Sequence, residues 1–170
     1  QAGVTIHQAE IRDYLSRHPQ RYDLIQLALL DAFNASASGL YALNESYLYT
    51  VEALQLYLEH LGADGYLAIT RWIKLPPRDS LKLLATLREA MQRAGIVDPE
   101  KRLLLIRSWQ TSTVLVKNGV FTAGEIAAAG AFCRQRSFDL GYAPGLDMAQ
   151  ANQYNVLPAP LFYQASTALL

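Results

Sequence analysis

The chain has 170 residues, 51% of them hydrophobic, which is enough for a single domain with a core of its own. Lys and Arg together number 15, as do Asp and Glu, so the formal net charge is zero. Because a neutral chain has no overall field to attract nucleic acid or anionic lipid, we expect no partner of either class.

The single cysteine, Cys133, excludes an internal disulfide and a cysteine metal cluster. We therefore expect a reducing compartment and a cytoplasmic location, at the cytoplasmic face of the membrane if the full-length protein is membrane-linked. No run approaches the roughly 20 apolar residues that cross a bilayer, so we expect no membrane contact by this segment. His7, His18 and His60 lack metal-ligand spacing, so no metal site is predicted.

The first half of the chain alternates between predicted strands and helices. Val4–Ile6 is short and β-branched, which predicts a strand, and residues 10–17 have the apolar spacing of a short helix. Residues 22–30 are apolar almost throughout, which is typical of a strand covered on both faces. A loop is predicted over 31–43, and Asn44 is the expected cap of the helix that follows.

The second half continues the alternation and adds a hairpin. It predicts a strand at 66–72, a helix from Asp79 or Ser80 to Gly95, and a hairpin of strands 103–109 and 113–117. A helix from the Thr122–Glu125 capping box to about Arg136 and a strand at 138–142 follow. From Pro144 onward the chain is expected to be irregular, and both ends suggest a fragment of a longer protein.

Strands separated by helices imply parallel neighbours with right-handed crossovers. The predicted fold class is therefore α/β, with a mostly parallel sheet that ends in an antiparallel hairpin and is flanked by helices. Such sheets bind ligands beyond the carboxyl ends of their strands, which here points to residues 8–10, 28–31 and 70–74. No GxG pair occurs, so a dinucleotide fingerprint and a P-loop are both excluded.

Three linked segments resemble one family. They are AEIRDYL at 9–15, YDLIQLALLDAF at 22–33, and the run GLYALNESYLYTVEALQLYLEHLGADGYLAITRW at 39–72. Together they resemble the second half of spermidine synthase-like proteins, in the class I S-adenosylmethionine-dependent methyltransferase superfamily. The closest subgroup is that of large bacterial proteins that join such a domain to membrane-spanning helices. The resemblance implies a partial Rossmann-like methyltransferase sheet in residues 1–143, with 144–170 as an irregular extension or the start of a following segment.

The resemblance places cofactor contacts at two points. AEIRDYL looks like the family's Gly-Asp-Ala/Gly-Arg-x-Phe-Leu motif, which puts Glu10 where an acidic residue contacts the adenine amino group. YDLIQLALLD looks like YDVIIVDSSD, which puts Ala28 and Leu29 beside the cofactor at the strand tip. A first-turn Glu that interacts only with the helix dipole is the alternative for Glu10.

The resemblance also implies catalytic and substrate-binding residues. Asp31 keeps the family's second acid, but Ala28 replaces the first one, which helps to deprotonate the attacking amine. Tyr41 falls where the family lines its amine pocket, and Glu45 matches the acid that opens the next helix. Independently of the resemblance, Trp72 clusters with Arg71 and Lys74 at a predicted strand end, which makes it a candidate contact for a flat or anionic substrate. The alternative for Tyr41 is a packed aromatic ring with a satisfied hydroxyl, and for Trp72 it is packing against a helix. The alternative for Glu45 is a simple interaction with the helix dipole.

In the superfamily the sheet order is 3-2-1-4-5-7-6, and the glycine loop follows strand 1. If Val4–Ile6 is strand 3, strands 1 and 2 lie upstream of this chain. S-Adenosylmethionine or its decarboxylated form is then the cofactor of the intact parent, and none is expected to bind the fragment. Residues 22–30 would lose a neighbour, so we expect self-association through this exposed edge or a rearrangement of Val4–Ile6 to cover it.

Two functions remain open at this point. One is transfer of an aminopropyl or methyl group to a small-molecule amine or another acceptor. The other is a non-catalytic regulatory or partner-binding domain of degenerate methyltransferase fold, which Ala28 favours. An unrelated α/β hydrolase is not favoured, because GxSxG is absent.

Overall fold

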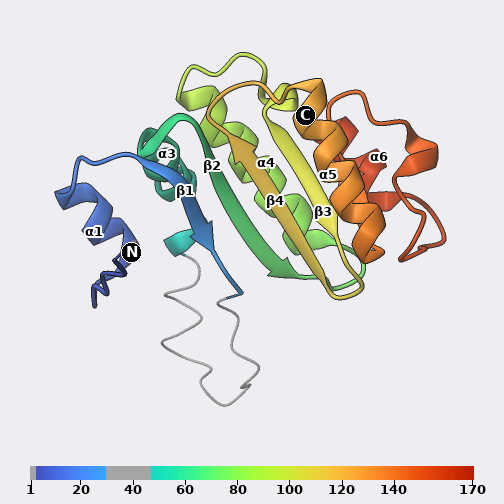
Figure 1. Ribbon diagram of the computed structural model, residues 1–170, viewed down its shortest axis with the longest axis horizontal. Helices are drawn as coiled ribbons and strands as arrows, with labels where there is room; N and C mark the ends of the chain where they lie inside the picture. The colour runs from blue at the N-terminus through green and yellow to red at the C-terminus, as the bar shows by residue number, and fades with distance from the viewer. Residues whose placement is uncertain (1–2, 30–46) are drawn as a thin grey trace.

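The computed structural model describes residues 3–29 and 47–170. This part of the chain forms a mixed five-stranded sheet flanked by helices, with the strand order β1-β2-β4-β3-β5 (Figure 1). The strands are β1 Tyr22–Leu27, β2 Leu61–Trp72, β3 Leu103–Arg107, β4 Thr111–Lys117 and β5 Asp139–Tyr142. β1 pairs with β2 in parallel, and the other three pairings are antiparallel.

Helices cover the two faces of the sheet unequally. The helices are α1 Ile11–Arg17, α3 Val51–Glu59, α4 Arg78–Arg93, α5 Ala123–Arg136 and α6 Leu161–Leu169, with single 3₁₀ turns at Pro99–Lys101 and Met148–Gln150. α1 packs on α3, α3 on α4 and α4 on α6, while α5 lies on the opposite face, over β3, β4 and β5 (Figure 1). None of the described helices is long and apolar enough to cross a membrane.

The larger core lies between the sheet and the α3–α4 layer. Leu54 and Tyr57 of α3, Leu84 and Leu87 of α4 and Ile69 of β2 are all fully buried there. A smaller cluster under α5 is built around Leu104, Phe121 and Cys133. Apolar side chains at helical spacing on α3 and α4 therefore form the layer that the sequence predicts.

Local signals in the sequence are confirmed in several elements. Thr122 and Glu125 form the reciprocal capping box of α5, and Gly95 ends α4 with a φ of 77°. The hairpin of β3 and β4 is antiparallel as expected. The sheet is nevertheless more mixed than predicted, because β4 lies between β2 and β3 and separates two strands that point the same way.

The prediction of a strand at Val4–Ile6 is wrong, since these residues form no ladder and Val4 and Ile6 are each 89% exposed. β1 is also not covered on both faces. Its Ile25 and Leu27 are buried on the helix face, but Leu24 on the other face is 54% exposed. Within residues 3–29 and 47–170, β2 is the only strand that pairs with β1, so β1 is an edge strand of the described sheet.

Other boundaries differ for physical reasons. α3 is capped by Thr50, whose side chain accepts the N–H of Ala53, and Asn44 lies outside the described residues. β2 begins at Leu61, five residues earlier than predicted, because Leu61 already pairs with Tyr22 of β1, with an irregular register between Tyr22 and Leu24. At Gly65 the two strands come so close that an added Cβ would lie 2.8 Å from the carbonyl oxygen of Tyr22. The segment after 144, expected to be irregular, contains α6, whose Phe162 is buried in the larger core.

Candidate functional site

Three strand ends define the carboxyl edge of the sheet. β1 is parallel to β2, and β4 is antiparallel to both β2 and β3, so β1, β2 and β3 point the same way. Ala28 and Leu29 follow β1 directly, Trp72 ends β2 and Arg107 ends β3. An α/β sheet binds its ligands beyond the carboxyl ends of its parallel strands, so these residues mark the candidate site.

Glu10 caps the helix that precedes β1. Its Oε2 accepts the N–H of Asp13 at 3.0 Å, and the residue is exposed. Arg12, two residues on, donates from Nη1 to the carbonyl oxygen of Tyr47 at 3.3 Å. Glu10, Arg12, Tyr47 and Leu48 line a cavity of about 360 Å³. The start of α1 therefore combines a carboxylate and a guanidinium at one small opening.

Aromatic and cationic groups continue from this opening to the end of β2. The Arg71 guanidinium lies 4.4 Å from the ring centroid of Tyr49, a cation–π distance. Tyr57 is fully buried, and no described group hydrogen-bonds its hydroxyl. Burial first, and then the carboxylate of Glu10, raises the pKa of Tyr57, while Arg12 opposes them. Such a set of groups suits a flat or anionic ligand.

The structure places four of the residues singled out in the sequence. Glu10 lies at the start of α1, Ala28 and Leu29 are exposed at the tip of β1, and Trp72 is half-buried, paired with Thr111 of β4. Ala28, Leu29 and Trp72 thus lie at the ends of adjacent parallel strands. The remaining three, Asp31, Tyr41 and Glu45, lie outside the described residues.

A polar row that the sequence did not predict crosses the sheet at the same edge. Arg71 of β2 is in register with Ser112 of β4, Ser112 with Arg107 of β3, and Arg107 with Asp139 of β5. The buried hydroxyls of Ser112 and Ser80 are 2.9 Å apart. Residues in register share a face of the sheet, so this row lies on the side covered by α4 and α6.

Asp139 is the most heavily bonded group of that row. Its Oδ1 accepts the N–H groups of Gln153 and Tyr154, and its Oδ2 accepts the N–H of Asn155 and Nη2 of Arg107 at 2.8 Å each. Burial by itself would raise the pKa of Asp139, but the N–H groups of residues 153–155 and Nδ2 of Asn155 outweigh it and lower the pKa. Burial lowers the pKa of Arg107, against the attraction of Asp139. The carboxylate therefore fixes residues 153–155 against the sheet.

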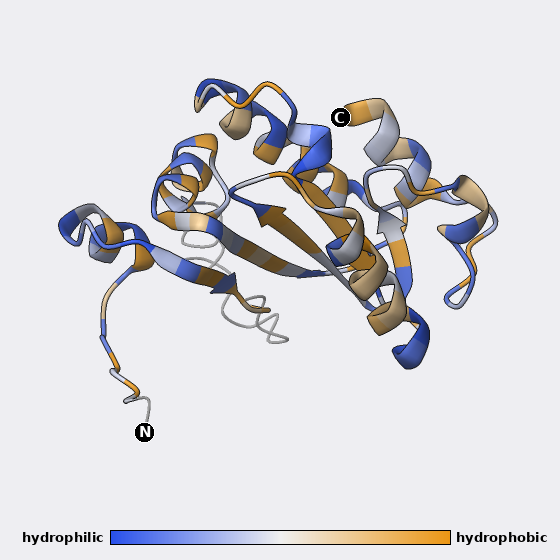
Figure 2. Cartoon of the chain, turned by 45° about the horizontal axis from the view of Figure 1, so that its top comes forward, coloured by the Kyte–Doolittle hydropathy of each residue, from blue (hydrophilic) through white to orange (hydrophobic). Residues whose placement is uncertain are grey.

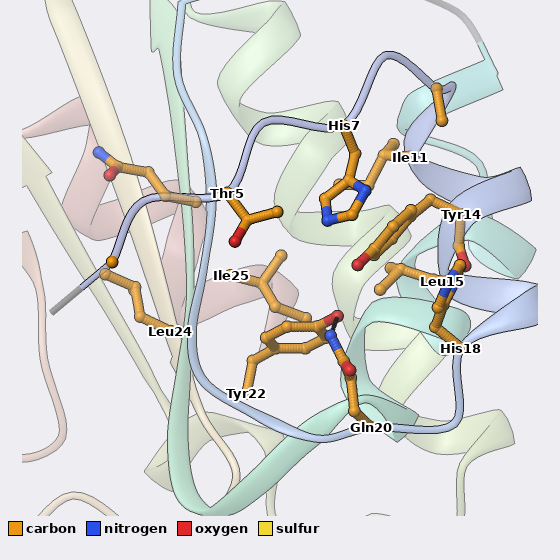
Figure 3. Close-up of a pocket in the computed structure, with 13 residues that line it drawn as sticks. Thr5, His7, Ile11, Tyr14, Leu15, His18, Gln20, Tyr22, Leu24 and Ile25 are labelled. Atoms are coloured by element: carbon orange, nitrogen blue, oxygen red, sulfur yellow. Dashed lines mark hydrogen bonds between the residues drawn. The ribbon is translucent and has the colours of Figure 1, made fainter.

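An open groove runs along the free side of β1. It has a volume of about 820 Å³ and lies between β1, α1 and the residues that precede α1. Figure 3 shows Thr5 and His7 on one wall and Tyr14 of α1 with His18, the residue after α1, on another. Tyr22, Leu24 and Ile25 of β1 lie opposite them. The rings of Tyr14 and His18 stack at 4.1 Å, and His7 lies 4.9 Å from Tyr14.

The remaining titratable clusters serve the fold. Lys117 is 5% exposed and bonds Glu125 at 2.9 Å and Asp64 at 3.0 Å, at the end of the sheet opposite the carboxyl edge. Burial raises the pKa of Cys133 to about 11, so its thiol is inert. Among the residues that the structure describes, no group of three or more His, Cys, Asp or Glu side chains could hold a metal ion.

Comparison with known proteins adds no family to this picture. The sequence matches no protein-family model, and it matches no curated protein.

Proposed function

We propose that the chain is the C-terminal portion of a spermidine synthase-like domain of the S-adenosylmethionine-dependent methyltransferase fold. The observation that carries this proposal is the strand order. β1-β2-β4-β3, with β4 antiparallel to both of its neighbours, corresponds to strands 4-5-7-6 of the superfamily order 3-2-1-4-5-7-6. Strands 1 to 3 would continue the sheet beyond the free edge of β1.

The helices and the strand tips support the same assignment. α1, α3 and α4 pack successively on one face, as crossover helices of a right-handed α/β sheet do. Glu10 lies at the first turn of α1, where the resemblance expects a carboxylate for the adenine amino group. Ala28 follows β1 at the carboxyl edge, where the resemblance expects the strand-tip acid.

The proposed reaction is transfer of an aminopropyl or methyl group to a small-molecule amine or another acceptor. The intact parent would use decarboxylated S-adenosylmethionine or S-adenosylmethionine, in the cytoplasm or at the cytoplasmic face of a membrane. A methyl side chain at position 28 cannot accept a proton, so deprotonation of an amine would need another group. Methyl transfer depends strongly on proximity and orientation and is less affected by this loss.

A second candidate is a regulatory or partner-binding domain that has kept the fold without the chemistry. Ala28 is the observation that favours it, because the residue is exposed at the position where the family's reaction needs an acid. In this case no group would be transferred, whether or not the carboxyl edge of the intact protein binds a cofactor-like ligand.

Calorimetric titration tests the proposal. The 170-residue chain alone is expected to give no binding heat with S-adenosylmethionine or its thioether analogue, because the glycine loop would lie on strands it lacks. A micromolar dissociation constant would contradict the assignment of β1 as strand 4.

In the natural polypeptide that carries this sequence, Ala28→Asp separates the two candidates. A transferase is expected to gain aminopropyl transfer by about 10²-fold or more, the usual size of a general-base effect, whereas the matched Ala28→Asn variant gains none. Equal inactivity of both variants in aminopropyl transfer and in methyl transfer, with or without cofactor binding, would favour the regulatory domain.

A further inference from the structure

Asn118 is the only asparagine in the sequence that precedes a glycine. It follows β4 directly, and Gly119 comes next. The other asparagines, Asn34, Asn44, Asn152 and Asn155, precede Ala, Glu, Gln and Val. Because glycine has no Cβ, its backbone nitrogen can approach the side-chain carbonyl carbon of a preceding asparagine with the least hindrance. Asn118 is therefore the asparagine whose chain neighbour most favours deamidation through a cyclic imide.

Hydrogen bonds fix Asn118 to the start of β2. Its Nδ2 donates to the carbonyl oxygens of Leu61 at 3.3 Å and Gly62 at 2.9 Å. Its backbone N–H donates to Gly65 at 2.8 Å, and its carbonyl oxygen accepts the N–H of Asp64 at 3.1 Å. β2 and β4 are antiparallel, so these partners lie beside the end of β4. Figure 2 shows the hydrophobic ribbon of β4 passing into a hydrophilic segment where it leaves the sheet.

The two groups that react in a deamidation are held very differently here. The N–H of Gly119, the attacking group, has no hydrogen-bond acceptor among the residues that the structure describes. The leaving group is Nδ2 of Asn118, which is bound to two carbonyl oxygens. Because Nδ2 departs as ammonia, the reaction breaks both of these bonds. The folded state therefore opposes a reaction that the local sequence favours.

We propose that Asn118 is a deamidation site gated by its contact with residues 61–65, and that the product cannot restore this contact. The nitrogen of Gly119 gives up its proton to solvent and attacks Cγ of Asn118. A C–N bond forms, and Nδ2 takes up a proton and leaves as ammonia. Water then opens the cyclic imide at either of its carbonyl groups, which gives aspartate or isoaspartate. No cofactor or substrate takes part, so the inference does not depend on the transferase assignment.

Neither product keeps the donor that the contact needs. A carboxylate at position 118 would face the carbonyl oxygens of Leu61 and Gly62, so acceptors would oppose acceptors. Isoaspartate also adds one carbon atom to the backbone, between the N–H that bonds Gly65 and the carbonyl group that bonds Asp64. These two backbone bonds then no longer fit the start of β2.

The charges nearby do not offset this loss. Asp64, whose N–H bonds position 118, adds a further negative charge. The cations at this edge are already engaged, since Nη1 of Arg21 donates to a carbonyl oxygen of β2 at 3.0 Å, and Nζ of Lys117 pairs with Asp64 at 3.0 Å and with Glu125 at 2.9 Å. Once the reaction has occurred, the start of β2 therefore stays open.

Peptide mapping by mass spectrometry, after incubation in mildly alkaline buffer, tests the site and its gate together. In denaturing urea Asn118 is expected to deamidate faster than Asn152 and Asn155, which are controls within the same digest. Without urea the rate at Asn118 should fall at least about tenfold, because the contact has to open first. A rate in urea no faster than that of the controls would overturn the site, and equal rates with and without urea would overturn the gate.

Asn118→Asp tests whether the product can restore the contact. This variant should unfold at lower urea concentration than the natural chain, and also lower than Asn118→Ala, which removes the same donor without adding a charge. The amides of residues 64 and 118 should exchange faster, while that of Leu105 in β3 stays protected. The deamidated fraction of the natural chain, separated by ion exchange, gives the same measurement without a substitution. Unchanged stability and unchanged protection of these amides would refute the proposal.

Discussion

Replacing Asp139 by asparagine tests the polar row most sharply. Asp139 is 1% exposed and accepts five hydrogen bonds, from Arg107, the N–H groups of residues 153–155 and Nδ2 of Asn155. Asparagine has the same shape, but it carries no charge, and its NH₂ would face at least two groups that also donate. Arg107, 3% exposed, would lose its ion-pair partner.

Removing one partner of a buried pair costs about 3–5 kcal/mol, and we expect a loss of this size in the free energy of unfolding. For a chain of this length each kcal/mol lowers the melting temperature by about 2–4 °C, so the midpoint should fall by roughly 6–20 °C. Urea unfolding followed by tryptophan fluorescence measures the free energy, and amide exchange should accelerate locally at Gln153, Tyr154 and Asn155.

Asp147→Asn is the matched control, since Asp147 lies in the same segment but is exposed, and its side chain accepts only the N–H of Ala149. This change should cost no more than about 1 kcal/mol. If Asp139→Asn were equally mild, or if the amides of residues 153–155 kept their protection, the carboxylate would not be what anchors this segment.

Three further outcomes follow from the packing and the charges. Gly141→Ala should destabilise the fold by about 1–3 kcal/mol, because the new Cβ would lie 2.6 Å from Cδ2 of the buried Leu105. Gly124→Ala is the control: its Cβ would have nothing nearer than 4.0 Å, so this change should stabilise α5 by up to about 1 kcal/mol. Thermal melts of both variants measure the difference. Phe162→Ala should cost about 3–5 kcal/mol in urea unfolding, since the ring is 2% exposed in the larger core, and a loss below 1 kcal/mol would mean that α6 is not part of that core. The Tyr66 hydroxyl, and after it Lys117 and Thr122, lower the pKa of Glu125 to about 2 from a usual value of 4.5. The stabilising contribution of Glu125 is therefore present above pH 4.5 and is lost as the pH falls toward 2. Glu125→Gln should flatten the acid limb of the plot of unfolding free energy against pH, and an unchanged limb would contradict this assignment.

Local signals in the sequence predicted local structure well. The capping box at Thr122, the terminating Gly95 and the hairpin of β3 and β4 each depend on residues close together in the chain. Val4–Ile6 has the propensity of a strand but no ladder partner among the described residues, so propensity alone gave the wrong result.

Long-range register explains what the sequence could not predict at the site. Arg107 and Asp139 are 32 residues apart and meet only because β5 pairs with β3, and no spacing signal marks them. Helix α6 begins at Leu161, and the residue before it, Pro160, provides no side-chain cap, so the usual start signal is missing. The carboxyl edge itself was predictable from the alternation of strands and helices, which placed Ala28, Leu29 and Trp72 correctly at strand ends.

Residue-resolved amide exchange along β1 tests the central claim most directly, namely that β1 is the edge strand of the described sheet and lies beside the carboxyl-edge site. At concentrations low enough to keep the chain monomeric, the amides of Leu24 and Gln26 should be protected by β2, and those of Asp23, Ile25 and Leu27 should exchange as freely as a loop. Equal protection of all five amides would mean that β1 has a strand on both sides, and fast exchange of all five would mean that it is not part of the sheet.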